Sequence, residues 1–312
     1  MEIIEGLANL NRVLIRPVVC VGNFDGVHLG HQALLGRVVS RARQIKGTAV
    51  ALTFHPHPVR VLNPAGGPPL LTVKARKEEL LAQTGLDILL NIQFTRQFAS
   101  LSARDFVNKI LIQKIGLAEF VVGYDQSFGQ GREGGLELIR SIGQKMGIPI
   151  HVIGPVKVGG QPVSSTRARE MIEAGQIEEV MRLLGRPYQI LGRVVRGHDR
   201  GGRLLGHPTA NLRLLSEVVP ARGVYAVVVQ LADGSSLNGV TNVGLNPTFD
   251  DQALSVETFI LDFKRDLYGE LIRLNFMARL RDEMKFDSSQ ELAGQIKKDV
   301  ALTRQLLSRE RA

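Results

Sequence analysis

The chain has 312 residues, of which 44% are hydrophobic and 22% charged, a globular composition with room for about two domains. No apolar run reaches the roughly 18 residues of a membrane span, no export signal is recognisable, and the single cysteine excludes an intrachain disulfide, so we expect a cytoplasmic protein. The net charge of +9 favours anionic partners, and since only 5% of residues are aromatic and none is Trp, we expect small polyanions such as nucleotides rather than nucleic acid.

Short apolar runs alternate with helical patterns through the first part of the chain. The strands we expect are residues 13–21, 48–54, 86–92, 119–122 and 150–153. The helices we expect are residues 31–46, 74–83, 103–114, 136–146 and 165–174. This alternation predicts an α/β domain, with a mostly parallel sheet and helices on both of its faces.

The pattern changes after Gly185, where strand-like runs are separated by Gly, Asn, Asp and Pro. The runs are residues 189–195, 224–230, 237–243, 255–263 and 271–276, and an amphipathic helix over 289–308 follows. They predict an antiparallel β-barrel with a C-terminal helix. We therefore expect two domains, residues 1–184 and 185–312.

The segment Gly22–His31 lies where the first predicted strand passes into a helix. Gly22 and Gly26 allow the backbone to approach a ligand closely, and the N-terminus of a helix favours phosphate. His28 and His31 could donate hydrogen bonds to charge that develops on a phosphate. A turn with two incidental histidines, or metal ligation by them, is the alternative.

A second candidate element is Ser164–Arg169, directly before another amphipathic pattern. Ser and Thr before a helix are most often simple N-caps. Two arginines at a second helix N-terminus could also hold phosphate in a bidentate manner.

These motifs resemble those of known enzymes. Gly22–His31 is similar to the HxGH motif of the adenylyltransferase superfamily, and Ser164–Arg169 to its S-S-T-x-x-R element. The Phe-Asp-Gly before the histidines and the segment Phe54–Pro58 resemble bacterial FAD synthetases. Gly123–Arg132 resembles that family's G-x-D-F-x-F-G-x-x-R stretch, although Gln126 replaces the usual Phe.

This resemblance implies a Rossmann-like nucleotidyltransferase domain that binds ATP and a flavin. It implies that His28, His31 and Arg169 are catalytic, and that Asp125 and Phe128 contact the flavin. The residues implied to bind ATP are Gly22, Asn23, Phe24, Asp25, Gly26, His28, His31, Ser164, Ser165, Thr166 and Arg169.

Two features of the second half could also be functional, one as a metal site and one as a general base. Thr209 and Asn211 flank Ala210, so in extended chain their oxygens would point the same way and suit Mg²⁺. A local turn stabilised by these side chains is the competing explanation. Glu257 lies in an otherwise apolar strand, where it either faces solvent or acts as a general base.

The second half resembles riboflavin kinase along nearly all its length, although His207 replaces the Phe of the usual G-F-P-T-A-N string. The resemblance implies that Glu257 is the kinase base and that Thr209 and Asn211 hold Mg²⁺. The residues implied to bind ATP in this domain are Gly197, Gly202, Arg203, Gly206, Thr209 and Asn211.

Together the resemblances imply that ATP phosphorylates riboflavin to FMN, and that a second ATP converts FMN to FAD. We expect small-molecule partners only, no nucleic acid or membrane, and a monomer or weak homo-oligomer. The alternatives are a flavin-binding regulator or carrier without turnover, and a nucleic-acid-binding protein suggested by charge alone.

Overall fold

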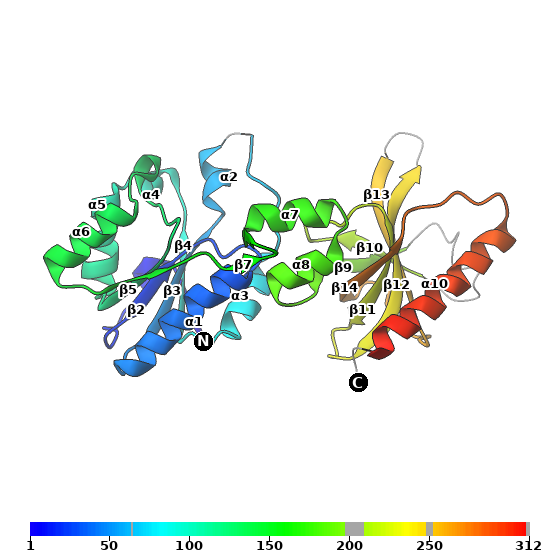
Figure 1. Ribbon diagram of the computed structural model, residues 1–312, viewed down its shortest axis with the longest axis horizontal. Helices are drawn as coiled ribbons and strands as arrows, with labels where there is room; N and C mark the ends of the chain where they lie inside the picture. Colours follow the sequence, from blue (N-terminus) through cyan, green and yellow to red (C-terminus); the bar gives the residue numbers. More distant parts are fainter. Residues whose placement is uncertain (64, 197–208, 248–251, 310–312) are drawn as a thin grey trace. The chain divides into compact units, whose positions relative to one another are not determined.

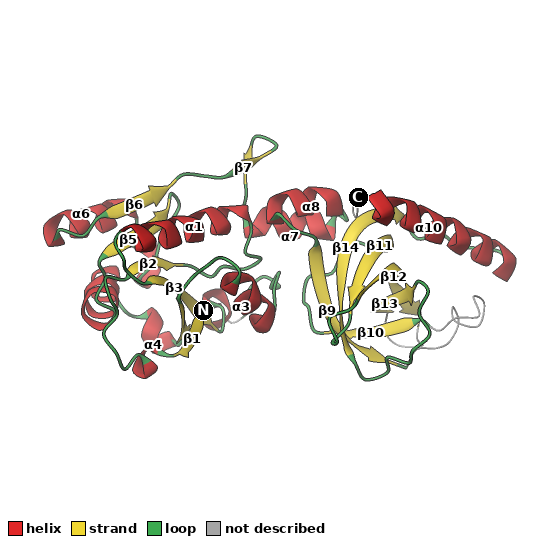
Figure 2. Ribbon diagram, turned by 90° about the horizontal axis from the view of Figure 1, so that it is seen from below, coloured by secondary structure: helices red, strands yellow, loops and turns green. Residues whose placement is uncertain are grey.

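The computed structural model describes residues 1–63, 65–196, 209–247 and 252–309. The chain divides into two compact units, Met1–Ser164 and Ser165–Ala312. Figures 1 and 2 show a sheet flanked by helices in the first unit and a barrel of strands in the second.

The first unit contains a parallel sheet of six strands in the order β1-β4-β3-β2-β5-β6. The strands are β1 (Glu2–Glu5), β2 (Val18–Val21), β3 (Ala49–His55), β4 (Ile88–Gln93), β5 (Glu119–Gly123) and β6 (Ile150–Ile153). The predicted parallel α/β architecture is therefore confirmed.

Helices cover both faces of this sheet because the side chains of each strand alternate between two apolar cores. Val18 and Cys20 of β2 pack in the core with α1 and α3, whereas Val19 and Val21 pack in the core with η2 and α6. The helices of this unit are η1 (Leu7–Asn9), α1 (Leu29–Gln44), α2 (Pro58–Leu62), α3 (Lys74–Ala82), α4 (Arg96–Ala99), α5 (Ala103–Asp105), η2 (Phe106–Lys114), η3 (Gln130–Arg132) and α6 (Leu136–Met146).

The first predicted strand, residues 13–21, forms as β2 and is shorter than its apolar run predicts. Val13 is 94% exposed, so the prediction that the strand begins there is wrong. Arg16 has a φ of 42°, a left-handed conformation that interrupts extended chain, and Pro17 has no N–H to donate. The strand consequently begins at Val18. The predicted helix 103–114 also forms differently, as α5 followed by the π-helical η2.

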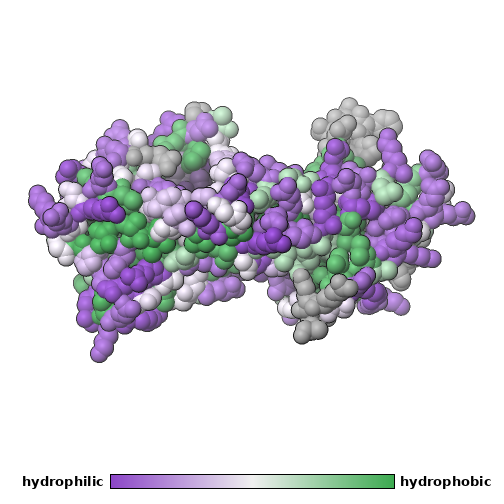
Figure 3. All heavy atoms as spheres, viewed as in Figure 1, coloured by the Kyte–Doolittle hydropathy of each residue, from purple (hydrophilic) through white to green (hydrophobic). Residues whose placement is uncertain are grey.

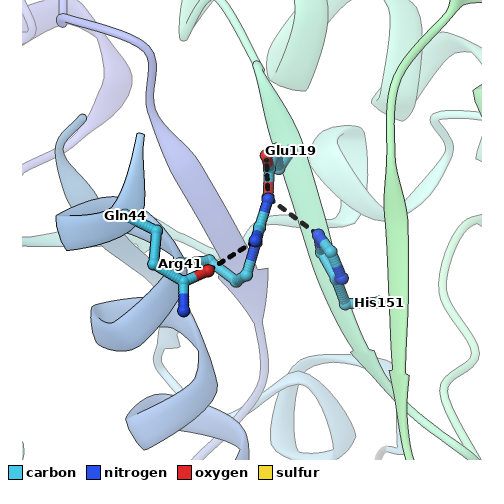
Figure 4. Close-up of polar contacts among 4 residues, drawn as sticks. All are labelled: Arg41, Gln44, Glu119 and His151. Atoms are coloured by element: carbon cyan, nitrogen blue, oxygen red, sulfur yellow. Dashed lines mark hydrogen bonds and ion pairs between the residues drawn. The ribbon is translucent and has the colours of Figure 1, made fainter. Parts of the chain in front are cut away.

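A buried ion pair ties α1 to the amino-terminal edge of the sheet. Arg41 donates two hydrogen bonds to Glu119 of β5, at 2.8 and 2.7 Å, and His151 of β6 lies 2.7 Å from the same carboxylate (Figure 4). The hydrogen bonds from Arg41 lower the pKa of Glu119, against the opposing effect of burial. This cluster fixes α1 at the sheet edge opposite to the carboxyl ends of the strands.

The second unit contains a closed barrel with the strand order β10-β13-β12-β11-β14-β9, in which all the paired strands are antiparallel. The strands are β9 (Tyr188–Val195), β10 (Ala210–Leu214), β11 (Gly223–Gln230), β12 (Ser236–Pro247), β13 (Gln252–Ile260) and β14 (Leu271–Arg281). The C-terminal helix α10 (Ser289–Arg309) packs on it, and Asp299 of α10 pairs with Arg281 at 2.8 Å. The predicted barrel and helix are confirmed.

Two helices precede the barrel within the second unit, α7 (Ser165–Glu173) and α8 (Ile177–Leu184). The main chain of Ala221 donates to Ile172 of α7, and the main chain of Arg279 donates to Glu178 of α8. A division at Ser165 thus keeps these helices with the barrel, whereas the sequence predicted a boundary near Gly185; that boundary stays a prediction. Several elements have no predicted counterpart, among them α8, β1, β10 and the hairpin of β7 (Lys157–Val158) and β8 (Gln161–Pro162).

Candidate active sites

The strand order places a crevice at the carboxyl end of β2. The chain leaves β2 through α1 to reach β3 on one side, while β5 lies on the other side of β2. In open α/β sheets, ligands bind where the strand order reverses in this way. A cavity of about 670 Å³ lies here, lined by Gly22 and Asn23 after β2 and by Asp125–Gly131 after β5.

Aromatic rings line much of this cavity. Ring centroids in the cluster lie 5.2–6.1 Å apart, mostly in edge-to-face or tilted arrangements. The rings belong to Phe54, Phe94, Phe98, Phe106 and Phe128. Because the cavity also holds the polar Asp125 and Gln126, it can take a planar apolar ring with polar edges.

The histidines of the HxGH motif lie together at the start of α1. His28 is 6% exposed and caps the helix, its Nδ1 accepting from the main chain of His31 at 3.3 Å. The two imidazoles are stacked, with centroids 3.7 Å apart, and Phe24 packs edge-on against His31. The structure therefore brings together the predicted histidines and the N-terminus of α1.

Burial and two neighbouring basic groups disfavour the charged form of His31. Desolvation, His28 and Lys77 all lower the pKa of His31 well below its ordinary value. Its Nδ1 is buried and has no hydrogen-bond partner among the described residues. A buried imidazole nitrogen without a partner can still bond to a ligand.

Gly22 and Gly30 fit this corner because larger residues would collide with the rings. A Cβ on Gly22 would lie 2.9 Å from the ring of Phe24, and one on Gly30 would lie 3.1 Å from the ring of His28. Phe24 itself has a φ of 51°, a conformation that non-glycine residues adopt mainly at functional or tightly constrained positions.

Asp25 anchors the segment that precedes α3. Its carboxylate is 4% exposed and accepts hydrogen bonds from the main-chain N–H groups of Leu71 and Thr72, both at 3.1 Å. Gly26 donates to the Thr72 hydroxyl at 3.2 Å, and a Cβ on Gly26 would meet Leu71 at 2.7 Å. These contacts hold Asp25 and Gly26 against the segment that precedes α3. Contact of Asp25 and Gly26 with ATP stays a prediction.

The S-S-T-x-x-R element spans the division between the units. Ser164 ends the first unit, and Ser165, Thr166 and Arg169 lie in α7, which belongs to the second. Arg169 is 9% exposed. Its role, and those of the three hydroxyl residues, stay predictions from the motif.

In the barrel, three polar residues from neighbouring strands form a row. Asn211 of β10 and Asn242 of β12 both lie directly opposite Glu257 of β13 in the strand registers. Residues paired in this way project from the same face of the sheet. Val256 and Thr258 are 1% and 0% exposed and fill the barrel, so Glu257 projects from the outer face, where it is half-buried.

Two local contacts shape this row. Ser255 is 8% exposed and donates to a carboxylate oxygen of Glu257 at 3.2 Å. Thr209 lies directly before β10, and the amide nitrogen of Asn211 donates to its main-chain oxygen at 3.4 Å. Thr209 and Asn211 thus lie at the start of β10, the strand that pairs with β13 and its Glu257.

The predicted ATP-binding residues Gly197, Gly202, Arg203 and Gly206 lie outside the described residues. Within the described ranges, no group of three or more His, Cys, Asp or Glu side chains could hold a metal ion by itself.

No sequence pattern pointed to Lys77, Thr53 or Ser255. Lys77 and Thr53 contact the Asn23 carbonyl, and Asn242 and Ser255 flank Glu257. A lysine in a helix or a serine in a strand carries no sequence signal of such contacts. The two-residue spacing of Ser255 and Glu257 was visible, since it puts both on one face of a strand.

Comparison with known proteins gives two family matches. Residues 11–167 match the FAD synthetase family, and residues 184–307 match the riboflavin kinase family. Curated relatives named bifunctional riboflavin kinase/FMN adenylyltransferase match the whole length. The relative from Pseudomonas fluorescens is 38% identical and that from Escherichia coli K12 is 36% identical, and in each case about 97–98% of both chains is covered.

A solved structure from Streptococcus pneumoniae, described as a macrolide-efflux protein, has the same fold along the chain. Its TM-score is 0.88 at 34% identity, and the match covers 97% of this chain and 99% of that one. In the part of the chain described here, no helix has the length and apolar character to cross a membrane. On the face drawn in Figure 3, hydrophilic side chains are interspersed with apolar ones.

Proposed function

The chain belongs to the family of bifunctional riboflavin kinases/FMN adenylyltransferases, and on that premise we propose which of its residues carry out each reaction. The riboflavin kinase part transfers a phosphoryl group from ATP to riboflavin, which gives FMN. The FAD synthetase part transfers the adenylyl group of ATP to FMN, which gives FAD and pyrophosphate.

In the adenylyl transfer, the flavin ring occupies the aromatic cavity and ATP lies at the N-terminus of α1. The cavity supports this assignment because Gly22 and Asn23 line it and directly precede the histidine corner. Phe128 and Asp125, which line the same cavity, contact the flavin. The FMN phosphate is then directed toward the α-phosphate of ATP.

The chemistry of this step needs alignment and charge stabilisation rather than a strong base. A phosphate oxygen of FMN forms a bond to the α-phosphorus of ATP, and the bond from that phosphorus to the bridging oxygen of pyrophosphate breaks. The FMN phosphate is already an anion at neutral pH. His28, His31 and Arg169 donate hydrogen bonds to the charge that develops on the α-phosphate and on pyrophosphate.

The single observation that best supports this assignment is the pair of stacked imidazoles, that of His28 buried, at the N-terminus of a helix whose preceding residues line the aromatic cavity. Positive charge from the helix dipole and donors from the imidazoles converge there. The matching test substitutes both histidines and measures FAD formation from added FMN and ATP.

In the kinase, Glu257 removes the proton from the ribityl hydroxyl of riboflavin as the γ-phosphoryl group is transferred. Its place in a half-buried row with Asn211 supports this role, because the base then lies next to the residue that would face the ATP phosphates. The test is the rate of FMN formation by a variant that keeps the shape of Glu257 but not its basicity.

Mg²⁺ fits the oxygen donors of Thr209 and Asn211, since it prefers hard oxygen ligands and retains waters and phosphate oxygens in its shell. When bound, the ion would neutralise charge on the ATP phosphates. The chain's own contribution is to hold these oxygens beside Glu257.

We also propose that this activity is cytoplasmic. We propose a monomer or weak homo-oligomer, since one chain carries both sets of candidate residues. The alternative of a flavin carrier without turnover lacks support, because the relatives are named for two enzymatic activities. Incubation with riboflavin, ATP and Mg²⁺, followed by chromatography for FMN and FAD, separates these possibilities.

A further inference from the structure

Lys77 of α3 contacts the backbone of the segment Gly22–His31, the proposed phosphate-binding segment. Its ammonium donates to the main-chain oxygen of Asn23 at 3.3 Å and to the hydroxyl of Thr53 at 3.1 Å. Thr53 is 1% exposed, and its hydroxyl donates to the same Asn23 oxygen at 3.3 Å. Two donors from different elements therefore fix the direction of a single carbonyl.

No carboxylate forms an ion pair with Lys77 among the described residues, although the negative charges of Asp25 and Glu78 act on it and oppose the effect of burial on its pKa. The contrast with Lys74, one turn earlier on α3, is clear, since Lys74 pairs with Glu5 at 2.6 Å and with Glu78 at 2.7 Å. Burial lowers the pKa of Lys77, whereas hydrogen bonds to two carboxylates raise that of Lys74 against the opposing effect of burial. A buried ammonium without a paired carboxylate is costly, and an anionic ligand would reduce that cost.

The fixed carbonyl also sets the direction of the next N–H group. In a trans peptide the C=O and N–H point in opposite directions, so holding the Asn23 oxygen toward Lys77 turns the Phe24 N–H the other way. Phe24 is 0% exposed and has a φ of 51°. Its N–H has no acceptor among the described residues. Buried backbone donors in such turns are nearly always paired, with a protein group, water or an anion.

We propose that Lys77 is a positioning residue for adenylyl transfer: it holds the Asn23–Phe24 peptide so that the Phe24 N–H meets a phosphate of the nucleoside triphosphate, and it supplies an unpaired positive charge behind that phosphate. This inference rests on the proposed function of the histidine corner. It adds a contribution from α3 that neither the HxGH nor the S-S-T-x-x-R motif contains.

The test uses the full chain and four variants. Lys77→Met removes the charge and both hydrogen bonds, and Thr53→Val removes the second donor to Asn23 while keeping the side-chain shape. Lys74→Met is the matched control, because this lysine lies on the same helix but is already paired. His28→Ala/His31→Ala reports on the proposed site itself. Each preparation is assayed for FAD formation from FMN, for FMN formation from riboflavin, for FMN affinity and for its melting temperature.

We expect Lys77→Met to lower kcat for FAD formation by up to about 100-fold, the scale of misplacing a reacting group. FMN affinity and FMN formation should stay near those of the unsubstituted chain, since the cavity and the barrel are untouched. Thr53→Val should show a smaller loss of the same kind, and Lys74→Met should leave kcat unchanged. A merely structural role would lower the melting temperature without lowering kcat per folded molecule.

Two outcomes separate the failures. If the double histidine variant loses FAD formation while Lys77→Met and Thr53→Val retain it, the positioning role of Lys77 is wrong and the proposed site stands. If the double histidine variant itself retains FAD formation, the proposed site is wrong, and the inference about Lys77 is overturned with it. Should Lys77→Met fail to fold, Thr53→Val alone decides, because its full activity would contradict the role of the Asn23 carbonyl.

Discussion

Asn211 and Glu257 lie directly opposite each other in the register between β10 and β13, so an amide and a carboxylate share one outer face of the barrel wall. Ser255 donates to the same carboxylate at 3.2 Å and limits its rotation. A solvated surface glutamate needs no such partners. The arrangement is the one expected for a base that must stay in place beside bound phosphates.

Substitution of Glu257, the proposed base, should affect turnover more than binding. Glu257→Gln keeps the shape but cannot accept the proton, so we expect single-turnover FMN formation to fall roughly 100- to 10,000-fold, with riboflavin affinity little changed. Glu270→Gln is the control, because Glu270 lies on the same barrel in an ion pair with Arg265 at 3.3 Å. Unchanged turnover in Glu257→Gln would show that Glu257 is a surface side chain and not the base.

The aromatic cavity predicts a selective loss of FMN affinity. The ring of Phe98 contacts the rings of Phe54, Phe94 and Phe106. Phe98→Ala removes one ring from the lining of the proposed flavin site, and the loss of one aromatic contact with the flavin, worth about 0.5–1.5 kcal/mol, should raise the KM for FMN in FAD formation by up to about tenfold. Riboflavin phosphorylation in the same preparation should be unaffected. An equal rise in both KM values would show that the cavity does not hold the FMN ring.

The Arg41–Glu119 pair predicts how stability depends on pH. Because the folded state lowers the pKa of Glu119 from its ordinary 4.5, the stabilisation is present above that value and is lost as pH falls through the lower folded-state pKa. Glu119→Gln should lower the melting temperature by about 5 °C at pH 7. The difference from the unsubstituted chain should shrink below about pH 4.

Asp262→Asn is the matched control for that titration. Asp262 pairs with Arg304 in a similar bidentate manner, but its side chain is 72% exposed. Solvent screening should leave the melting temperature nearly unchanged. An equal effect of the two substitutions would show that burial of Glu119 has no importance for stability.

The contacts of α7 and α8 predict which barrel fragment is stable. Ile177, Val180, Leu183 and Leu184 of α8 are all at most 1% exposed, and Glu178 accepts from the main chain of β14. A fragment that starts at Arg186 loses this helix, whereas one that starts at Ser165 keeps it. Since burial of one large apolar side chain stabilises by about 1.5–3 kcal/mol, the longer fragment should melt at a higher temperature. Equal melting temperatures would contradict a role for α8 in the barrel unit.

Sequence periodicity predicted the parallel sheet, the barrel and one apolar face of α1. Of the residues that the spacing puts on this face, Leu34, Leu35, Val38 and Ala42 are buried and Val39 is partly buried. It failed where local backbone geometry decided the outcome. Strand β2 begins at Val18 rather than at Val13 because of Arg16 and Pro17. Strand β1 is too short and too polar to give a periodic pattern.

In the candidate sites, too, the sequence pointed to some residues and not to those that depend on tertiary contacts. The histidines were singled out by their resemblance to the HxGH motif, and Glu257 because a carboxylate is unusual in an apolar strand; their roles stay proposals. Lys77 could not be singled out, because its contact with Asn23 joins α3 to the end of β2 and depends on tertiary packing. The role of Asp25 in holding Leu71 and Thr72 was equally invisible, since those residues lie far along the chain.

The most direct test of the account compares His28→Ala/His31→Ala with Glu257→Gln in the full chain, each supplied with ATP and Mg²⁺ and either riboflavin or FMN. We predict that the histidine variant converts riboflavin to FMN but makes FAD at least about 100-fold more slowly. The Glu257 variant should make little FMN from riboflavin yet convert added FMN to FAD at the normal rate. Loss of both products in either folded variant, or normal FAD formation without the histidines, would contradict the assignment of the two reactions to these two sites.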